Sequence, residues 1–479
     1  MMRDSSTADR VLAVDLDGTL IRGDMLYECL WCAMAHNWRA PLVAAQGLAA
    51  GKPALKRALA DLGPVDVASL PYDPQVIARI EAWRAAGGRT ALITASDNQL
   101  AEAVAAHLGL FDEVQGTTPD CNLKGQTKAA LLVERYGTNG FVYIGDSRAD
   151  LPCWACADAA ITVGASSKFR AEVAGVNADV THLSPPEALI WPVLKAMRPH
   201  QWLKNILVFV PILANQSFTL TALMQGLLAF VAFGLVASAG YLLNDLLDLG
   251  PDRAHSRKRF RPLASGRLSV PVGTALVPVL LAAGLLVSAL LGGAFAAVIA
   301  FYFVMTMAYS LFLKRKPIID ICVLAGLYTL RIVAGGVATG IELSIWLLAF
   351  SLFFFFSLAT VKRQAELVHI KNSGLSDAAG RAYTVEDLPL TMQMALTSGF
   401  VSVLVMALYL NTPEVQAKYS APSLLWGVNI LLLYWISRVV LTTHRGGMDD
   451  DPLVYAVTDR TSLVVFGLIT ALGAGAILL

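Results

Sequence analysis

The sequence predicts two domains of different class: an α/β domain first, then an all-helical domain that crosses a membrane nine times. Up to about residue 190, charged residues recur regularly and short apolar runs alternate with helical segments; after residue 202, long apolar stretches dominate. The chain of 479 residues is 56% hydrophobic and 15% charged, which is too apolar for an ordinary soluble protein. We therefore place the domains at 1–185 and 202–479, joined by a linker or amphipathic approach to the membrane at 186–201.

Five apolar runs in the first domain are predicted strands: VLAVDLDGTL, RTALITAS, DEVQGT, GFVYIGD and AAITVG. Strands that alternate with helices form a doubly wound sheet, whose site lies beyond the carboxyl ends of the strands. The polar residues at these ends are Asp15, Asp17, Thr94 and Asp146. A long, helix-like insertion at about 22–71 is expected to form a cap over that site.

Other features of this domain exclude some classes of function. The N-terminus lacks the uninterrupted apolar core of a signal peptide, so we expect the first domain to stay in the cytosol. Net charge is +1 and no basic face lies outside the membrane loops, so nucleic acid is not expected as a partner. Two CxxC pairs, Cys29/Cys32 and Cys153/Cys156, are compatible with a zinc or redox site. Against such a site, the pairs are far apart in sequence and lack ligand-loop glycines. We expect them to be half-buried helix residues.

Four segments of the first domain resemble, in order, the motifs of haloacid dehalogenase-like (HAD) phosphohydrolases. These segments are Asp15-Leu-Asp17-Gly-Thr-Leu, Thr94, Lys124 in LKGQTK, and Gly145-Asp146 with Asp150. The resemblance covers the whole domain and implies a HAD-like fold with phosphatase activity.

The resemblance also implies catalytic roles. Asp15 would be the nucleophile that forms an aspartyl-phosphate, and Asp17 would protonate the leaving oxygen and then activate water. Thr94 and Lys124 would bind the transferring phosphoryl group, although Lys128, one helical turn later, could take the place of Lys124.

Mg²⁺ is the cofactor that the resemblance implies for this domain. Asp146 would hold it together with Asp15 and the backbone carbonyl of Asp17, and Asp150 would support it. The alternative is a decayed domain kept as a cap or scaffold. The complete set of acids speaks against that alternative, because unsupported buried acids are costly.

Nine apolar stretches are expected to cross the membrane, and most are long enough to do so. They are 203–216, 221–246, 271–290, 292–313, 318–340, 343–361, 391–411, 422–443 and 460–479.

Charge in the loops predicts the orientation of these stretches. The loops 247–270, 314–317, 362–390 and 444–459 carry many Lys and Arg, whereas Lys418 is the only one found in the opposite loops. Positively charged loops stay in the cytosol. The N-terminus is therefore expected on the cytosolic side of the inner membrane and the C-terminus on the opposite side.

Three carboxylates, Asp245, Asp248 and Asp252, end the second apolar stretch in YLLNDLLDLGPD. Spacings of three and four put them on one face of a helix. Oxygen-only ligands suit Mg²⁺, which normally brings substrate phosphates with it. Asn244 could hydrogen-bond the substrate. The basic residues that follow could hold its phosphates: Arg257, Lys258, Arg259 and Arg261. A topology signal that touches lipid headgroups would explain these cations, but not three spaced acids beside them.

Further charged residues lie at helix ends or inside helices, where charge is expensive and usually functional. Asp320 and Arg331 are about three turns apart and can share a helix face. They form one set with Tyr309 and Lys314. For the basic turn Lys314–Lys316, contact with lipid headgroups is as good an explanation as a functional role. A second set consists of Lys362, Arg363 and Glu366.

The segment NDLLDLGPD resembles the first Asp-rich motif of the UbiA superfamily of intramembrane prenyltransferases, and the resemblance covers essentially the whole second domain. The family implies nine helices, Mg²⁺ and a diphosphate substrate. Ordinary members carry a second motif with paired aspartates, whereas the corresponding region here has only Asp320. That departure speaks against ordinary prenyl transfer.

One branch of the superfamily is more similar. RPHQWLKN, NDxxDxxxDRxHxxKRFRPLASG, YSLxLKxxPxxDxxxLAxxxxLRxxAGG and VKRQAEL resemble the branch that transfers 5-phosphoribose from phosphoribosyl diphosphate (PRPP) to decaprenyl phosphate. The acceptor would be a polyprenyl phosphate that enters from the bilayer. Its anchors would come from four unranked candidates: Lys204, Lys314, Arg331 and Lys362.

Other functions stay open on sequence alone. The main alternative is a prenyltransferase that joins a polyprenyl diphosphate to an aromatic or other acceptor, beside an independent phosphatase. A transporter and a non-catalytic scaffold are further alternatives, but the acids are grouped at one membrane boundary rather than at the midplane that a transporter would use. A homo-oligomer is compatible with every alternative.

Overall fold

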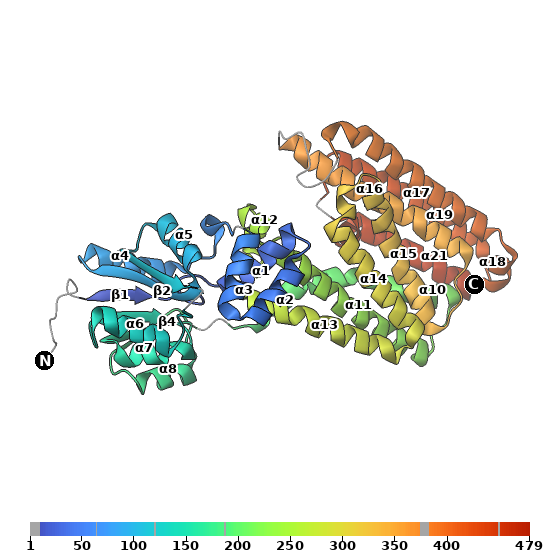
Figure 1. Cartoon of the computed structure of the whole chain (residues 1–479). Coiled ribbons are helices and arrows are strands. Elements are labelled where there is room, and N and C mark those ends of the chain that lie inside the picture. The colour runs from blue at the N-terminus through green and yellow to red at the C-terminus, as the bar shows by residue number, and fades with distance from the viewer. Residues whose placement is uncertain (1–9, 64, 119–120, 186–187, 374–382, 449–450) are drawn as a thin grey trace. The chain divides into compact units, whose positions relative to one another are not determined.

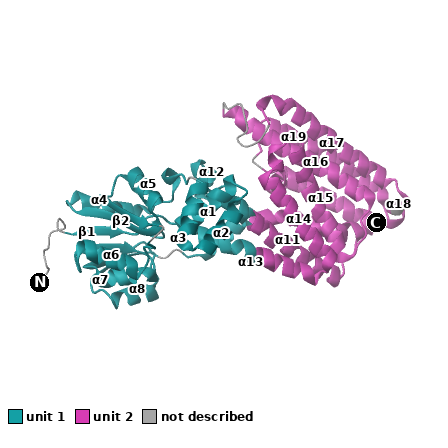
Figure 2. Cartoon of the chain, viewed as in Figure 1, with its two compact units in different colours: residues 1–198, 241–279 teal, residues 199–240, 280–479 magenta. Residues whose placement is uncertain are grey.

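The computed structural model describes all residues except 1–9, 64, 119–120, 186–187, 374–382 and 449–450. The chain forms two compact units (Figure 2). Unit 1 comprises Met1–Arg198 and Tyr241–Val279; unit 2 comprises Pro199–Gly240 and Leu280–Leu479. Unit 1 therefore contains the expected soluble domain and also the segment with the three carboxylates. The domain boundaries at 185 and 201 stay predictions.

A six-stranded parallel sheet forms the centre of the N-terminal part of unit 1, with the order β3-β2-β1-β4-β5-β6. Figure 1 labels β1, β2 and β4 of this sheet. The strand order is doubly wound, and it confirms the predicted α/β class. The sixth strand was not predicted, because VTHL is short and half polar. The strands are β1 (Val11–Val14), β2 (Arg89–Asp97), β3 (Glu113–Thr117), β4 (Phe141–Gly145), β5 (Ala159–Val163) and β6 (Val180–Leu183).

Helices cover both faces of this sheet, which is why β1 is apolar at every position. Leu12 and Val14 pack into one core with α4 and α5, while Val11 and Ala13 pack into the other with α6, α7 and α8. Alternate residues of a strand point to opposite faces, so each core receives half of the strand. The helices are α4 (Pro74–Ala85), α5 (Asn98–Leu108), α6 (Gln126–Tyr136), α7 (Leu151–Cys156) and α8 (Ser167–Ala174).

Three helices form the insertion that was expected as a cap: α1 (Met25–His36), α2 (Ala40–Ala50) and α3 (Lys52–Leu62). Asp24 caps α1 by accepting hydrogen bonds from the backbone of Leu26 and Tyr27. The cap has a small core of its own around Cys29 and Leu59. All six cysteines are free thiols, and both CxxC pairs lie on helices, α1 and α7.

The later part of unit 1 begins with the end of α11 (Leu220–Leu247), continues through α12 (Leu249–Ala254) and reaches the start of α13 (Val270–Leu290). This part packs against the cap. Arg253 on α12 donates two hydrogen bonds to Glu28 on α1, and the indole of Trp31 donates to Thr274 at 2.8 Å. Before α11 lies the short amphipathic helix α9 (Ile190–Met197).

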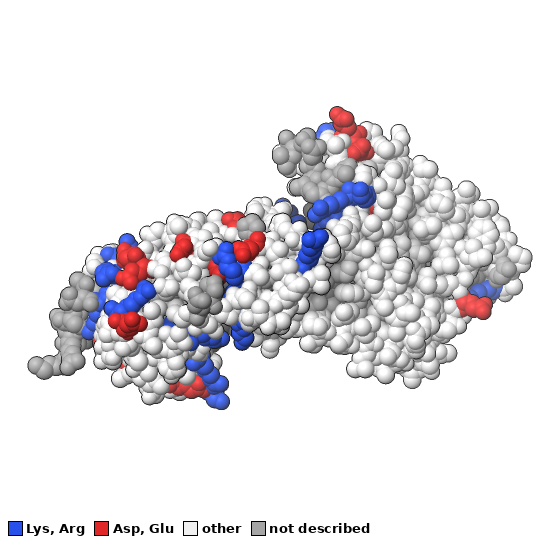
Figure 3. Space-filling view, in the orientation of Figure 1, with Lys and Arg blue, Asp and Glu red and all other residues white. Residues whose placement is uncertain are grey.

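Within the described residues, eight helices are long and apolar enough to cross a membrane by length and composition. The broad, nearly uncharged face of unit 2 in Figure 3 agrees with this. The spans are Leu220–Leu247, Val270–Leu290, Gly293–Leu311, Ile319–Thr339, Ile345–Asn372, Val385–Leu410, Pro422–His444 and Arg460–Leu478. Their helices are α11, α13, α14 (Gly293–Leu311), α15 (Ile319–Thr339), α16 (Ile345–Asn372), α17 (Leu388–Leu410), α19 (Trp426–His444) and α21 (Arg460–Leu478), with the short helices α18 (Pro413–Lys418) and α20 (Pro452–Thr458) between spans.

The predicted count of nine spans is not confirmed. The expected first span, 203–216, is divided between the 3₁₀ helix η4 (Pro199–Phe209) and the short α-helix α10 (Val210–Asn215). Pro211 lies in the first turn of α10, where a missing backbone N–H breaks no hydrogen bond of that helix. The same proline prevents one continuous helix from running through the stretch. The 3₁₀ helix nevertheless packs closely in unit 2, since a Cβ on Gly335 would lie 2.1 Å from the carbonyl oxygen of Val208.

Candidate active sites

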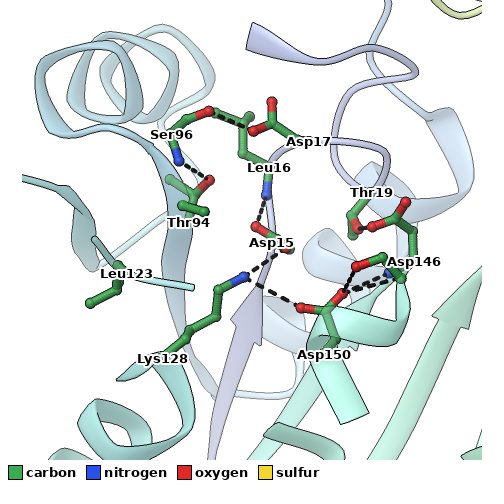
Figure 4. Close-up of polar contacts among 12 residues, drawn as sticks. Asp15, Leu16, Asp17, Thr19, Thr94, Ser96, Leu123, Lys128, Asp146 and Asp150 are labelled. Atoms are coloured by element: carbon green, nitrogen blue, oxygen red, sulfur yellow. Dashed lines mark hydrogen bonds and ion pairs between the residues drawn. The ribbon is translucent and has the colours of Figure 1, made fainter. Parts of the chain in front are cut away.

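The predicted nucleophile, Asp15, lies directly after β1 and points into the site (Figure 4). One of its carboxylate oxygens accepts the backbone N–H of Leu16 at 2.8 Å, and the other accepts the ammonium of Lys128 at 2.7 Å. Burial raises the pKa of Asp15, and Lys128 opposes that rise. Each oxygen of the Asp15 carboxylate is thus fixed by one short hydrogen bond, which suits the predicted role of Asp15 as the nucleophile.

The cation that contacts Asp15 is Lys128 and not Lys124. Lys128 is buried on α6 and also contacts the Tyr143 hydroxyl at 2.8 Å and Asp150 at 3.4 Å. Lys124 precedes α6 and lies exposed on the wall of the same cavity. The left-handed Gly125 (φ +60°) starts the helix between them, so the first inward-facing position of α6 belongs to Lys128.

Asp17, the expected acid and base, is held by two hydrogen bonds. It accepts the Ser96 hydroxyl at 2.5 Å and the backbone N–H of Met25 at 2.7 Å. Burial, with repulsion from Asp24, raises the pKa of Asp17 to about 7, so that it can carry a proton near neutral pH. Thr94 is buried and accepts the backbone N–H of Ser96 at 3.0 Å. Ser96 itself lines the cavity, and sequence analysis missed it because the motif ends at Thr94.

Three carboxylates of this site fit a divalent cation. Ligand oxygens of Asp15, Asp146 and Asp150 lie within 4.8 Å of one another. Burial, followed by repulsion from Asp15, raises the pKa of Asp146 well above its usual range. One ammonium, from Lys128, does not balance these charges, so Mg²⁺ with its preference for oxygen suits the site.

Two further features shape this acidic cluster. Gly18 has φ +68°, and a Cβ there would lie 2.2 Å from Asp146, so only glycine admits that carboxylate. Asp150 accepts the N–H and hydroxyl of Ser147 at 3.1 and 3.0 Å. These hydrogen bonds hold Asp150 in place within the acidic cluster.

In the later part of unit 1, Asp245, Asp248 and Asp252 each have different hydrogen-bond partners. Asp245 accepts two hydrogen bonds from Arg198, at 2.5 and 2.7 Å, and one from Arg261 at 3.1 Å. Arg261 also contacts Asp252 at 2.5 Å, while Asp248 accepts the amide of Asn244 at 2.9 Å.

Because of these pairings, the carboxylates of Asp245, Asp248 and Asp252 are not clustered in the way that those of Asp15, Asp146 and Asp150 are. Among the described residues, the three acids do not gather as a metal-binding group. Burial raises the pKa of Asp252, and Arg261 opposes that rise. Arg198 was missed by sequence analysis; its signal was the RPHQWLKN motif. Three of the predicted phosphate ligands are exposed: Arg257, Lys258 and Arg259.

In unit 2, Asp320 is fully buried and forms an ion pair with Arg363, whose Nε lies 2.7 Å from the carboxylate. Tyr383 donates its hydroxyl to the other oxygen of Asp320 at 2.7 Å. Arg363 also contacts Glu366, and it donates to the hydroxyl of Tyr309 at 3.4 Å. Asp320 is thus enclosed by protein groups.

Arg331 is also buried in unit 2, and the groups that accept its hydrogen bonds are neutral. It donates to the amide oxygen of Asn205 at 3.1 Å and to the Tyr302 hydroxyl at 3.0 Å, and the rings of Phe233 and Tyr328 flank it at 5.7 Å. Dipoles and aromatic faces stabilise the guanidinium without neutralising its positive charge, as a carboxylate would.

The remaining predicted cations differ in their surroundings. Lys204 forms an ion pair with Asp451 at 2.5 Å. Burial acts to raise the pKa of Asp451, but Lys204 and Lys362 outweigh it and lower that pKa. Lys314 and Lys362 are half-buried.

Comparison with known proteins gives two family matches, the UbiA prenyltransferase family over residues 206–446 and haloacid dehalogenase-like hydrolase over residues 12–155. The chain is 40% identical over 465 residues to the uncharacterized protein y4nM of Sinorhizobium fredii, covering 96% of this chain and 90% of that one. It is 31% identical over 303 residues to decaprenyl-phosphate phosphoribosyltransferase of Mycolicibacterium smegmatis, covering 60% of this chain and 95% of that one.

Solved structures include a UbiA homolog from Archaeoglobus fulgidus bound to GPP and Mg²⁺, with 18% identity and a TM-score of 0.44; the match covers 60% of this chain and 100% of that one. The family matches, together with the eight apolar helices, identify a multi-pass membrane enzyme. The chain belongs to the UbiA prenyltransferase family and carries a haloacid dehalogenase-like hydrolase domain before its membrane domain.

Proposed function

We propose that the membrane domain transfers 5-phosphoribose from PRPP to a polyprenyl phosphate, and that the HAD domain then removes the 5-phosphate from the lipid product. The observation that supports PRPP as the donor is that Arg363 and Tyr383 enclose Asp320. A fully buried acid that already faces a guanidinium and a tyrosine hydroxyl is a poor second metal ligand of the kind that prenyl transfer uses. The relative from Mycolicibacterium smegmatis, whose name is that of such a transferase, supports the same donor.

The basic residues of unit 1 suit the donor's charge. PRPP carries one phosphate more than a prenyl diphosphate, and the segment after Asp252 supplies Arg257, Lys258 and Arg259 as exposed cations. Arg261 would exchange its contacts with Asp245 and Asp252 for phosphate oxygens when the donor binds, because the acids would then face Mg²⁺.

Transfer would proceed by displacement at the anomeric carbon. A phosphate oxygen of the lipid attacks C1 of the ribose, the bond from C1 to the pyrophosphate oxygen breaks, and pyrophosphate leaves. Positive charge on C1 spreads onto the ring oxygen. Of the candidate anchors for the acceptor, Arg331 is favoured, because the Asn205 amide and the Tyr302 hydroxyl that it contacts are neutral and leave its charge for a phosphate.

The HAD domain would then act on the product by the route its geometry supports. Asp15 attacks the 5-phosphate, Asp17 protonates the departing ribose oxygen, and Lys128 balances charge on Asp15. Asp17 next takes a proton from water, which attacks the aspartyl-phosphate and releases phosphate. Mg²⁺, held by Asp245, Asp248 and Asp252 for transfer and by Asp15 and Asp146 for hydrolysis, would supply neutralisation of phosphate charge.

Both reactions would occur at the cytosolic surface of the inner membrane, since PRPP is a soluble nucleotide precursor and the basic loops favour that side. Two sites on one chain raise the local concentration of the intermediate. The orientation with the C-terminus outside requires segment 199–215 to cross. At about 2.0 Å per 3₁₀ residue and about 1.5 Å per α residue, its 17 residues reach roughly 30 Å, which is the thickness of the hydrocarbon core.

The test is a PRPP-dependence assay on the purified full chain with Mg²⁺ and polyprenyl phosphate, the lipid products being resolved by mass. A ribosylated lipid that forms only with PRPP supports the proposal. Consumption of a radiolabelled polyprenyl diphosphate without PRPP would favour prenyl transfer instead.

A further inference from the structure

The phosphatase site lies in a cavity of about 870 Å³ in unit 1, and three parts of the chain form its walls. The sheet edge supplies the catalytic carboxylates, and cap helices α2 and α3 supply Leu48 and Lys52. The third wall comes from the loop that leads into α13, with Gly266, Arg267 and Ser269. This loop follows the basic segment of the membrane domain in sequence.

The loop is fitted closely to the HAD domain. Gly266 has φ +73°, and a Cβ there would lie 2.8 Å from Cβ of Arg22 and 3.0 Å from its carbonyl oxygen. The ion pair of Arg253 with Glu28 and the hydrogen bond from Trp31 to Thr274 join the cap to the same part of the chain. The phosphatase cavity is therefore incomplete without residues that follow the transferase acids.

Four cations on the cavity wall have no ion-pair partner within the described ranges: Lys52, Lys56, Lys124 and Arg267. Lys56 donates to the backbone carbonyl of Ala95, whereas among the described residues no such contact engages the other three. The other two basic residues of the wall form ion pairs: Arg22 with Asp73 and Lys128 with Asp15. Hydrolysis of one phosphate uses Lys128. The remaining cations provide charge for a second anionic group on the same substrate.

The cavity wall also contains exposed apolar side chains. Leu48 and Leu189 line it and are 62% and 51% exposed, and Ile190 and Trp191 continue the apolar surface along α9. On the other wall, Pro271 belongs to the first turn of α13, one of the eight candidate spans. Free cations beside exposed apolar side chains, next to the start of a membrane helix, match a phosphate that is attached to a lipid.

We propose that this cavity selects a lipid-linked phosphomonoester, and that Arg267, with Lys52 and Lys124, binds the second phosphate, which joins the sugar to the lipid. The assignment rests on the proposed function for the identity of the sugar. The atoms exchanged are those of the hydrolysis described above: water enters, and inorganic phosphate and the sugar hydroxyl leave.

The experiment compares two substrates on the purified full chain. The lipid probe is decaprenyl-phosphoryl ribose 5-phosphate, made beforehand by a separate decaprenyl-phosphate phosphoribosyltransferase and placed in phosphatidylcholine vesicles. The soluble probe is ribose 5-phosphate. Phosphate release is measured for wild type, Arg267→Ala and Arg267→Lys, with Arg79→Ala as the control, because Arg79 is an exposed arginine of α4 outside the cavity.

We expect the wild type to prefer the lipid probe by about 100-fold in kcat/KM. Arg267→Ala should lower that value about 10-fold, mainly through KM, while changing ribose 5-phosphate hydrolysis by less than about two-fold. Arg267→Lys should fall between, and Arg79→Ala should match wild type. Equal use of both substrates, or an equal loss on both in Arg267→Ala, overturns the inference.

The two proposals fail separately in this design. If the lipid probe is hydrolysed in the expected pattern but the chain makes no ribosylated lipid from PRPP, the lipid selectivity stands and the transferase proposal is wrong. If neither probe is hydrolysed, the phosphatase role and the lipid selectivity both fall.

Discussion

The guanidinium of Arg253 forms a two-point ion pair with the carboxylate of Glu28, at 2.7 and 2.9 Å, and both side chains are buried. Glu28 lies on α1 of the phosphatase cap, while Arg253 is the neighbour of Asp252 on α12. Parallel contacts between arginine and a carboxylate fix both geometry and distance. The pair therefore ties the cap of the proposed phosphatase site to the helix that carries Asp252, one of the acids proposed for transfer.

Removing one partner of this pair should loosen unit 1. Glu28→Gln leaves Arg253 as a buried, unpaired charge, which costs about 3–5 kcal/mol. Hydrogen–deuterium exchange in α1 and α12 should accelerate. Glu172→Gln is the matched control, because its pair with Arg148 is exposed, and it should change little. Unchanged exchange in Glu28→Gln would contradict the assignment.

The two lysines of the third HAD motif should differ sharply. Lys128→Met removes the ammonium that lies between Asp15 and Asp150, so hydrolysis of a soluble ester such as p-nitrophenyl phosphate should fall by about 100-fold or more in kcat. Lys124→Met should lower kcat less than about three-fold, because its side chain is exposed on the cavity wall. Circular dichroism checks that both variants fold. The reverse order of effects would restore Lys124 as the cation of the nucleophile.

Metal removal should stop both reactions. Chelation with EDTA should abolish transfer and hydrolysis, and added Mg²⁺ should restore them. Asp146→Asn should raise the Mg²⁺ concentration needed for half-maximal hydrolysis by about 10-fold or more, and leave that for transfer unchanged. An equal shift in both reactions would mean that the metal requirement resides elsewhere.

Asp320 should behave as the partner of Arg363 and not as a metal ligand. Arg363→Gln strands a fully buried carboxylate and should lower transfer strongly, whereas the double variant with Asp320→Asn should recover part of it, since neutral pairs can replace buried ion pairs. The Mg²⁺ dependence of transfer should be unchanged in Asp320→Asn. A rise of about 10-fold in the Mg²⁺ requirement would instead identify Asp320 as a ligand.

Local sequence patterns were sufficient for much of the fold. The apolar run of β1, followed by Asp15 and Asp17, predicted both the strand and the edge of the sheet where the site lies. Long apolar stretches predicted eight of the spans. These features depend on neighbours in sequence, which is what periodicity reports.

What the sequence did not reveal depends on contacts between distant residues. The choice of Lys128 over Lys124 depends on where α6 begins after Gly125. The pairing of Asp245 with Arg198 joins residues 47 positions apart, and Ser96 reaches Asp17 across 79. The close packing of η4 on α15, where Val208 meets Gly335, likewise joins residues that are distant in sequence.

The transferase acid should be separable from the phosphatase. Asp245→Asn removes the charge that holds Arg198 and Arg261, so transfer from PRPP should fall below detection. Hydrolysis of a soluble phosphate ester by the same variant should stay within about two-fold of wild type, because Asp15 and Lys128 are untouched. Loss of both activities would show that Asp245 acts through folding.

The most direct measurement is the mass of the lipid formed from PRPP, polyprenyl phosphate and Mg²⁺ by three purified proteins. Wild type should yield the ribosylated lipid, Asp15→Asn the same lipid with one phosphoryl group more, and Asp245→Asn no ribosylated lipid. A ribosylated product from Asp245→Asn, or a wild-type product that keeps its 5-phosphate, would contradict the account.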